Sequence, residues 1–296
     1  MPTFGEAERR IAQLLCRGNT FTYQGNNFTI VNSGKPTCMK GEPKTDIYVE
    51  AESEYGNLVE IKITYKKENA DFIENKTNAV RAKALFGDEW ENIIMQATES
   101  IRDVFESKKL IYKSAAGRTE RGAITLGWKY ELLNKTGGGL SGLVELTREQ
   151  IIDVYAGTHI SKDKRDARVN GKIIENCGIA NFILMNDNVE TTQEIIDNLY
   201  TIEDYVNHYP TVYFACKALN YRTFYNKYDG NRPLSVYVDW YVENGKLCHD
   251  LVFDSPLSVG GDEAADNLIA ALNDLGIDTT DDITADIVSN PSIINF

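Results

Sequence analysis

The fold of this chain is decided by the stretch KTDIYVEAESEYGNLVEIKITY, residues 44–65, which contains two short runs of alternating apolar and polar residues. The alternation predicts one strand over residues 45–51 and a second over residues 59–65, because successive side chains of a strand point to opposite faces of its sheet. The polar residues between these runs end in Gly56-Asn57, which is a turn signal. We therefore predict a β-hairpin with one apolar face and one polar face.

The polar face of this hairpin would carry acids and a lysine. Alternation places six side chains on it: Asp46, Tyr48, Glu50, Glu60, Lys62 and Thr64. Two carboxylates and an ammonium group suit phosphodiester hydrolysis, because Mg²⁺ prefers carboxylate oxygens and lowers the pKa of a bound water that attacks phosphorus. A neighbouring lysine orients that water or offsets the negative charge that develops. We predict Asp46 and Glu60 as catalytic metal ligands and Lys62 as the assisting catalytic group.

These residues resemble the active site of the PD-(D/E)XK nucleases, which include many type II restriction endonucleases. In that family a Pro-Asp lies on one strand, an acid-x-Lys lies on the next strand of the same sheet, and a leading helix often supplies another acid. The triplet Glu-Ile-Lys at 60–62 matches the acid-x-Lys element, and Asp46 matches the upstream acid, 14 positions before it. The departure is Lys-Thr-Asp in place of Pro-Asp, with Pro43 three residues before the acid. The resemblance covers roughly residues 5–130.

The resemblance implies a metal cofactor and a further acid. The cofactor would be Mg²⁺, for which Mn²⁺ would substitute. The leading helix, predicted over residues 5–17, contains Glu6 and Glu8 as candidates for the helix acid, and Glu50 is another candidate at the hairpin itself. The alternative interpretation makes Glu50 a partner of Lys62 or a solvated acid, and makes Glu6 and Glu8 ordinary acids on a helix surface.

Beyond the hairpin, helices and strands alternate in a mixed order. We predict a helix at 5–17, a hairpin at 20–32, one or two helices within 71–106, a strand at 124–133, a helix at 146–157, a β-type run at 173–185, a helix at 191–209, a strand at 211–219, a hairpin at 234–253 and a helix at 262–275. This order favours an α/β fold, with α+β as the alternative, and a mixed β-sheet flanked by helices. Residues 1–160 would form a restriction-endonuclease-like core. Residues 161–296 would form a C-terminal α/β extension for DNA recognition or dimerisation, unless the chain is one continuous domain.

The composition is that of a globular protein. Of the 296 residues, 42% are hydrophobic and 25% are charged. No apolar run approaches the roughly 18 residues that a membrane helix needs, so no membrane partner is expected. The five cysteines are scattered and none falls in a CxxC pair, which argues against a disulfide framework and against a zinc site. The N-terminus lacks the pattern of a signal peptide, and we expect a cytoplasmic protein.

The net charge of −13 opposes binding to a polyanion, so a nuclease of this sequence needs local basic segments. The candidates for DNA contact are Lys66, Lys67, Lys76, Asn78, Arg118 and Arg121. The loop SKDKRDAR at 161–168 offers four more basic side chains, with a solvated charged loop as the equal alternative. The expected partner is double-stranded DNA. Cleavage of both strands of a palindrome normally needs two active sites, which predicts a homodimer.

The sequence thus predicts a Mg²⁺-dependent DNA endonuclease of the restriction type. Two other functions stay open. One is a non-catalytic acidic protein that binds nucleic acid or protein, which the net charge of −13 would suit. The other is a repair or recombination nuclease with the same fold.

Overall fold

The computed structural model describes residues 4–66, 72–75, 77–186 and 188–296. The chain forms two compact units, each built from two separate stretches of sequence. Unit 1 comprises Met1–Asp71 and Thr147–Thr211, and unit 2 comprises Phe72–Leu146 and Val212–Phe296. The boundary predicted between residues 160 and 161 falls inside unit 1, because a strand from the second stretch completes the sheet begun by the first.

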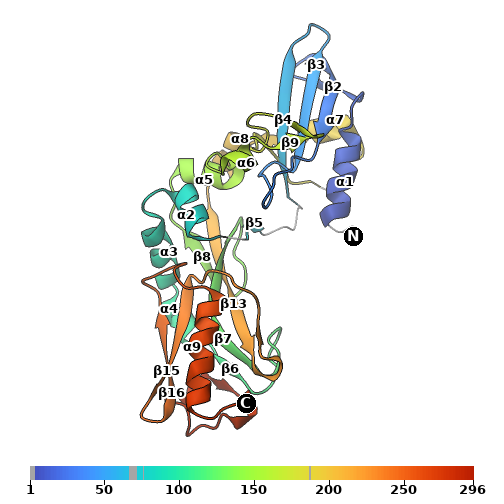
Figure 1. Cartoon of the computed structure of the whole chain (residues 1–296). Helices are drawn as coiled ribbons and strands as arrows, with labels where there is room; N and C mark the ends of the chain where they lie inside the picture. Colours follow the sequence, from blue (N-terminus) through green and yellow to red (C-terminus); the bar gives the residue numbers. More distant parts are fainter. Residues whose placement is uncertain (1–3, 67–71, 76, 187) are drawn as a thin grey trace. The chain divides into compact units, whose positions relative to one another are not determined.

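Unit 1 contains a six-stranded sheet with the order β1-β2-β3-β4-β11-β12 (Figure 1). The strands are β1 (Thr20–Tyr23), β2 (Asn26–Gly34), β3 (Ile47–Ser53), β4 (Leu58–Tyr65), β11 (Phe182–Leu184) and β12 (Leu199–Thr201). The first four strands form an antiparallel meander, β11 lies parallel to β4, and β12 is antiparallel to β11. The sheet is therefore mixed, as the sequence predicts.

The apolar face of the β3–β4 hairpin forms the core of unit 1. The helices of this unit are α1 (Phe4–Leu14), α5 (Arg148–Ala156), α6 (Lys162–Arg165), α7 (Thr192–Asp197) and α8 (Ile202–His208). One buried cluster joins α1, α7 and the sheet, and its members include Ile11, Ile47, Val49, Ile61 and Ile195. Burying these side chains contributes about 1.5–3 kcal/mol each relative to leaving them exposed. This burial fixes which face of the hairpin stays polar.

A short hairpin lies near the polar face of the same sheet. It consists of β9 (Arg168–Val169) and β10 (Lys172–Ile173), which pair in antiparallel fashion. Ala167, Val169 and Cys177 from this part of the chain form a small buried cluster with Tyr48 of β3. The segment from α6 to Cys177 therefore packs against the β3–β4 hairpin on the face that carries the predicted site residues.

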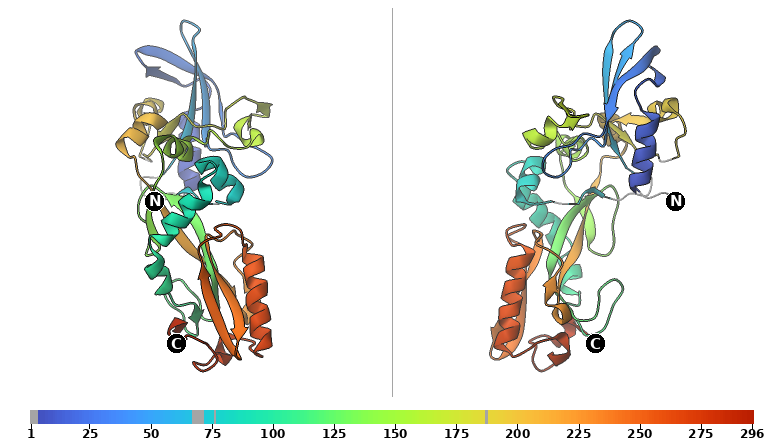
Figure 2. Two further views of the ribbon diagram at one scale, coloured as in Figure 1. Left: turned by 90° about the vertical axis from the view of Figure 1, so that its left-hand side faces the viewer. Right: turned by 45° about the vertical axis from the view of Figure 1, so that its right-hand side comes forward.

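Unit 2 contains a larger sheet with the central order β14-β13-β7-β15-β16 and with β5, β6, β8 and β17 attached at its margins. Its strands are β5 (Phe72–Glu74), β6 (Ile111–Tyr112), β7 (Ala123–Leu133), β8 (Ser141–Val144), β13 (Val212–Arg222), β14 (Lys227–Tyr228), β15 (Val236–Glu243), β16 (Lys246–Val252) and β17 (Ile294–Asn295). Its helices are α2 (Ala79–Phe86), α3 (Trp90–Glu99), α4 (Arg102–Glu106) and α9 (Gly261–Asp274), with 3₁₀ turns at Thr223–Tyr225, Thr280–Asp282 and Pro291–Ile293. Helix α9 packs along β15 and β7 (Figure 2).

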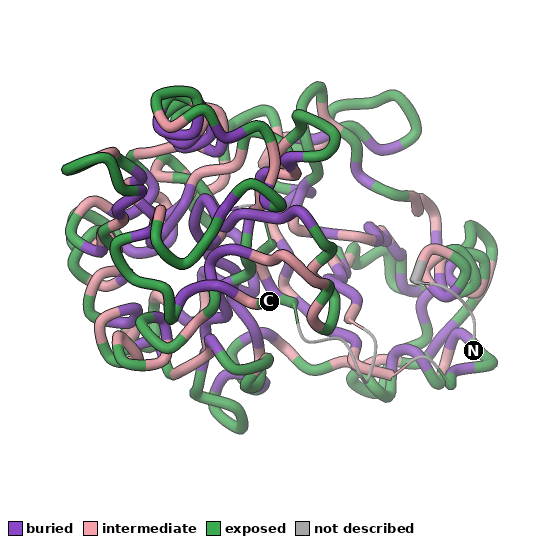
Figure 3. Tube along the Cα trace, turned by 90° about the horizontal axis from the view of Figure 1, so that it is seen from below, coloured by how far each residue is buried: buried purple, intermediate pink, exposed green. Residues whose placement is uncertain are grey.

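The predicted mixed α/β class is confirmed, and so are several elements. The hairpins at 20–32 and 234–253 are present, the latter turning at Asn244-Gly245. Helix α9 matches the helix predicted at 262–275, and α5, which matches the helix predicted at 146–157, begins with a capping box of Thr147 and Gln150. Buried and exposed stretches alternate along the chain trace, in keeping with the amphipathic patterns (Figure 3).

Two predicted elements are wrong in extent. The single helix predicted over 191–209 is two short helices, because Leu199–Thr201 leaves the helix to pair with β11 as β12. Only Phe182–Leu184 of the β-type run at 173–185 joins the six-stranded sheet of unit 1. The residues before it turn instead, with Asn176 in the left-handed region at φ 56°. Apolar content alone favoured a strand there, but the backbone at Asn176 ends any extended run.

Candidate active site

The register of the β3–β4 hairpin sets the geometry of the site. Tyr48 pairs with Lys62, and Glu50 pairs with Glu60. These four side chains share the polar face, whereas Ile47, Val49, Ala51, Ile61 and Ile63 are buried on the other face. The predicted alternation is thus confirmed. We refer to Tyr48, Glu50, Glu60 and Lys62 as the polar quartet.

Tyr48 holds one carboxylate of the quartet in place. Its hydroxyl donates a hydrogen bond of 2.6 Å to Oε1 of Glu60, and the Tyr48 side chain is only 1% exposed. Desolvation by burial raises the pKa of Tyr48, and the hydrogen bond to Glu60 raises it further. The phenol therefore stays protonated and remains a donor to Glu60. The second oxygen of Glu60 is left for another partner on an exposed part of the strand.

Lys62 is fixed at both its backbone and its side chain. Its Nζ donates to the carbonyl oxygen of Asn176 at 3.3 Å. The side chain of Asn181 bridges the edge of β4, where its Oδ1 accepts from the Lys62 amide at 2.7 Å and its Nδ2 donates to the Glu60 carbonyl at 3.0 Å. Asn181 thus holds the acid-x-Lys triplet where β11 has not yet begun. The sequence analysis missed this residue, whose only signal is an asparagine directly before an apolar run.

Asp46 lies one residue before β3 and has different neighbours. Its Oδ2 accepts a hydrogen bond of 2.7 Å from the Tyr65 amide, in place of a backbone carbonyl. Burial raises the pKa of Asp46, an effect that Lys66 and the Tyr65 amide partly offset. The charge of Glu8 also raises this pKa, and Lys35 lowers it.

Glu8 is the helix acid of this region. It forms a 2.9 Å ion pair with Lys35, so α1 does bring an acid toward the start of β3. Asp46, Glu8, Lys35 and Lys66 form what we call the end cluster. Glu6, the other acid considered for this role, is exposed on α1. The structure therefore places Glu8, rather than Glu6, in the electrostatic neighbourhood of Asp46.

The register brings Glu50 and Glu60 together but separates Asp46 from Glu60. One step beyond the Ile47–Ile63 pair, Asp46 falls opposite Thr64. Thr64 is four residues along β4 from Glu60, about 13 Å at about 3.3 Å per residue. Glu50 stands directly across from Glu60, where Cβ atoms are about 4.5–5.5 Å apart. The predicted ligand pair is therefore split between the quartet and the end cluster, and Glu50 is the nearer acid.

The acidic side chains of the polar quartet and of the end cluster have the ligand chemistry that Mg²⁺ prefers. All are carboxylates, and this ion is usually held by one or two carboxylates together with waters and substrate phosphates. Within the described ranges, no three His, Cys, Asp or Glu side chains converge as a complete protein cage for a metal ion. A site of this type would rest on the pair Glu50 and Glu60, with substrate oxygens completing the coordination.

The residues predicted to contact DNA are divided between the two units. Lys66 belongs to the end cluster of unit 1, and Lys67 and Lys76 lie outside the described residues. Three others lie in unit 2: Asn78, Arg118 and Arg121.

The unit 2 members of that set have visible local roles. The Asn78 side chain caps α2 by accepting from the Arg81 amide at 2.8 Å. Arg121 forms a 2.6 Å ion pair with Asp281 and lies over the ring of Phe224. Arg118 is exposed in the turn before β7. Capping and ion pairing account for Asn78 and Arg121 without nucleic acid.

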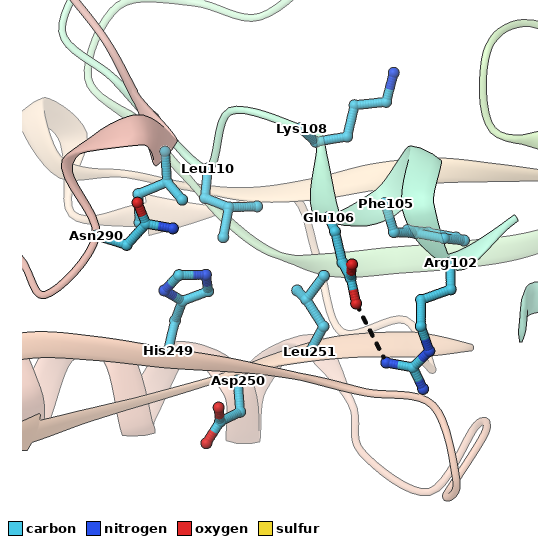
Figure 4. A pocket seen from close by; sticks show the side chains of 10 residues that line it. Arg102, Phe105, Glu106, Lys108, Leu110, His249, Asp250, Leu251 and Asn290 are labelled. Carbon is cyan, nitrogen blue, oxygen red and sulfur yellow. Dashed lines mark ion pairs between the residues drawn. The ribbon is translucent and has the colours of Figure 1, made fainter.

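Unit 2 contains a pocket of about 400 Å³ between α4 and β16 (Figure 4). His249 points into it between Asn290 and Leu110, and burial lowers the pKa of His249. The Glu106 carboxylate is held 3.6 Å from Arg102, whose guanidinium lies over Phe253. Lys108 and Asp250 point away from the pocket (Figure 4). The pocket therefore offers one neutral imidazole and few unengaged polar groups.

Models of protein families, curated proteins and solved structures were compared with the chain, and none matches it. In the part of the chain that the structure describes, no helix has the length and apolar character to cross a bilayer. The function must therefore be argued from the side chains of the site.

Proposed function

We propose that unit 1 is a Mg²⁺-dependent DNA endonuclease that hydrolyses phosphodiester bonds at the polar face of the β3–β4 hairpin. The observation that carries this proposal is the register, which sets Glu50 opposite Glu60 and Lys62 diagonally beside them. An acid pair for a hard cation and an ammonium group for a phosphate thus lie on one polar face. The order of elements also agrees with the PD-(D/E)XK resemblance, since α1 carries an acid and the acid-x-Lys strand neighbours the strand that follows Asp46.

The proposed metal ligands are Glu60 and Glu50, with Asp46 as a third acid at the start of β3. The resemblance assigns Asp46 and Glu60 to the metal, and the register adds Glu50 as the partner nearest to Glu60. When bound, Mg²⁺ would polarise the phosphate and lower the pKa of a coordinated water. Mn²⁺ would substitute because it accepts the same oxygen ligands.

The side chains of the chain itself perform the remaining tasks. Lys62 offsets negative charge on the phosphate, and its hydrogen bond to the Asn176 carbonyl keeps the ammonium group near the quartet. Tyr48 donates to Glu60 and so fixes which carboxylate oxygen faces outward. Asn181 holds the backbone between Glu60 and Lys62. Each of these contacts reduces the reorganisation needed when substrate binds.

The experiment is a cleavage assay on supercoiled plasmid and linear DNA with Mg²⁺, with Mn²⁺ and with EDTA. The wild-type protein should cleave with either ion and not with EDTA. Glu60→Gln should abolish cleavage, because it removes the charge of the metal ligand that the resemblance and the register both propose. Glu52→Gln is the matched control, since Glu52 is an exposed acid on the same face of β3 and should leave cleavage unchanged.

The outcomes separate the related proposals. Defined fragments would support a restriction-type enzyme, and a smear or nicked product would favour a repair or recombination nuclease. A requirement for two copies would show as cleavage that rises with the square of protein concentration and as a dimer in light scattering. Absence of cleavage on DNA and RNA with both ions would overturn the proposed function.

A second candidate function is supported by the charge distribution in unit 2. Residues 247–296 contain ten acids and neither Lys nor Arg, and α9 begins with Asp262 and Glu263. Such a surface suits a non-catalytic protein that binds basic partners. In the same assay this protein would cleave nothing, and it would be captured by a polylysine resin in a manner that salt reverses.

A further inference from the structure

Two segments of unit 1, far apart in sequence, form one basic surface beside the polar quartet. The first is the loop at residues 35–44 and the second is residues 161–172, from the start of α6 to β10. Together they carry eight Lys or Arg residues against three acids: Lys35, Lys40, Lys44, Lys162, Lys164, Arg165, Arg168 and Lys172 against Glu42, Asp163 and Asp166. The net charge of +5 over 22 residues contrasts with −13 for the whole chain. We call this the basic surface.

Backbone hydrogen bonds lock the two segments together. The Thr37 amide donates to the Arg168 carbonyl at 2.9 Å, and the Arg168 amide donates back to Thr37 at 2.8 Å. The Met39 amide donates to Asp163 at 3.1 Å. These bonds hold the two segments side by side. Their positive charges therefore form one continuous surface rather than two separate ones.

Gly178 joins the basic surface to the start of the hairpin. Its carbonyl accepts from the amides of Lys44 and Thr45, at 3.0 and 3.1 Å, and its own amide donates to Arg165 at 2.9 Å. A Cβ atom at this position would lie 1.8 Å from the Lys164 carbonyl oxygen, so only glycine fits. The position of the basic surface relative to β3 is therefore fixed by backbone contacts.

The basic surface borders the quartet directly. The carbonyl oxygen of Asn176, three residues after β10, accepts a hydrogen bond from the Lys62 ammonium group. The next residue, Cys177, packs against Tyr48. A phosphodiester chain lying across α6 and the loop at 35–44 would thus continue onto the face that carries Glu60 and Lys62.

Several cations of the basic surface have no carboxylate partner, although Lys35 and Arg165 do. Among the described residues, Lys40, Lys162, Lys164 and Lys172 form no ion pair with a carboxylate. In unit 2 the cations commonly have acidic partners, as in Arg81–Glu74, Arg121–Asp281 and Lys217–Glu131. Lysine and arginine side chains that neutralise phosphates release the counterions condensed on the nucleic acid, and this release supplies much of the affinity for its backbone.

We infer that the basic surface, residues 35–44 with 161–172, binds the phosphate backbone of duplex DNA and leads it to the quartet. This inference rests on the proposed function for its substrate. The contacts are to phosphates, so the surface contributes affinity and position without reading sequence.

The test measures binding of a fluorescein-labelled 20-base-pair duplex by anisotropy in EDTA, with Glu60→Gln as background so that no cleavage occurs. In that background, Lys162→Gln with Lys172→Gln should weaken binding about tenfold. It should also lower the slope of log K against log[salt] by about 1.8, at about 0.9 per phosphate contact. The matched control is Lys227→Gln with Lys246→Gln, two exposed lysines of unit 2, which should change neither quantity. Circular dichroism checks that all variants fold.

The outcomes separate this inference from the proposed function. Equal binding by the two double variants would overturn the inference, even if the wild-type protein cleaves DNA. Binding lost only in the Lys162/Lys172 variant would uphold it, even if no cleavage is found. Preferential binding of labelled polyglutamate over the duplex would overturn it in favour of an acidic protein partner.

Discussion

The β3–β4 hairpin of unit 1 and the β15–β16 hairpin of unit 2 carry the same acidic pattern. In the first, Glu50 stands opposite Glu60. In the second, Asp239 stands opposite Asp250. Each pair has a tyrosine diagonally across, since Tyr48 donates to Glu60 and Tyr241 interacts with Asp250.

The difference between the hairpins is the residue opposite the tyrosine and the burial of the ring. Tyr48 faces Lys62 and is 1% exposed, whereas Tyr241 faces Cys248 and is 37% exposed. An opposed acid pair is therefore an ordinary feature of a sheet surface in this protein. The lysine and the buried phenol distinguish the candidate site, and the unit 2 hairpin supplies matched controls for its acids and its tyrosine.

Among the features that differ between the two hairpins, the lysine should have the largest effect on cleavage. Lys62→Met should reduce cleavage at least about 100-fold, because it removes the cation that offsets charge on the phosphate. Lys246→Met on β16 should leave the rate unchanged. Initial rates on plasmid at saturating Mg²⁺ measure both. If Lys62→Met retained its activity, the lysine would not be what makes the unit 1 hairpin a catalytic site.

The next effect concerns the acid pair. Glu50→Gln should raise the Mg²⁺ concentration for half-maximal cleavage about tenfold or more, because one carboxylate of the pair is lost. Asp239→Asn should not shift the Mg²⁺ dependence. A Mg²⁺ titration of initial rates gives the comparison, with Asp46→Asn measured beside it. A shift in Asp46→Asn and none in Glu50→Gln would place the ion at the end cluster and contradict our assignment.

A smaller effect should follow from the phenol. Tyr48→Phe removes one buried hydrogen bond to Glu60, which should lower the free energy of unfolding by about 1 kcal/mol. Cleavage should fall by about tenfold because Glu60 is less well oriented. Tyr241→Phe, at an exposed ring, should change neither. Urea unfolding and cleavage rates test the pair, and a loss of stability without a loss of rate would make Tyr48 a packing residue only.

The smallest effects are on the pH dependence of stability. Burial raises the folded-state pKa of Asp46 above its unfolded value, so its contribution is present at low pH and is lost as pH rises through the folded pKa. Asp46→Asn should therefore raise the melting temperature at pH 7, where burial opposes ionisation of the wild-type carboxyl group, and have little effect at pH 3. The amide oxygen can still accept from Tyr65. An unchanged or lower melting temperature at pH 7 would contradict this.

His249 in unit 2 should behave in the opposite sense. Burial lowers its folded-state pKa below the unfolded value of about 6.5, so stability is present above that value and is lost as pH falls through the folded pKa. His249→Gln should flatten the stability profile between pH 6.5 and 4.5. Melting curves over that range, with His208→Gln at an exposed histidine as control, would show whether the pocket histidine is responsible.

Local pattern was enough to predict the hairpin and its polar face. Alternation around Gly56-Asn57 fixes which residues share a face, and the structure agrees for Tyr48, Glu50, Glu60 and Lys62. The pattern could not fix the pairing, because a shift along the strand by two residues preserves the faces and changes every partner. That is why Asp46 and Glu60 were predicted together as metal ligands, whereas in the structure the acid opposite Glu60 is Glu50.

Contacts between segments that are distant in the sequence could not be predicted from local sequence patterns. Asn181 reaches Glu60 and Lys62 across more than 100 residues, and its one local signal, its place directly before an apolar run, does not indicate these partners. The joining of the loop at 35–44 to residues 161–172 depends on Gly178, whose glycine is required by an approach visible only in three dimensions. For the same reason, the basic loops could be recognised but not assigned to a common surface.

The parallel pairing of β4 with β11 has a consequence for synthesis on the ribosome. Strand β4 ends at Tyr65 and its partner begins at Phe182, so the edge of β4 at Ile63–Tyr65 stays open until more than 100 further residues have been made. Open strand edges template pairing with other chains, and such long-range pairs form slowly. The nascent chain therefore passes through a period in which the edge of β4 that β11 later covers can pair with another chain. A chain stalled before Phe182 would lack the partner strand that covers this edge.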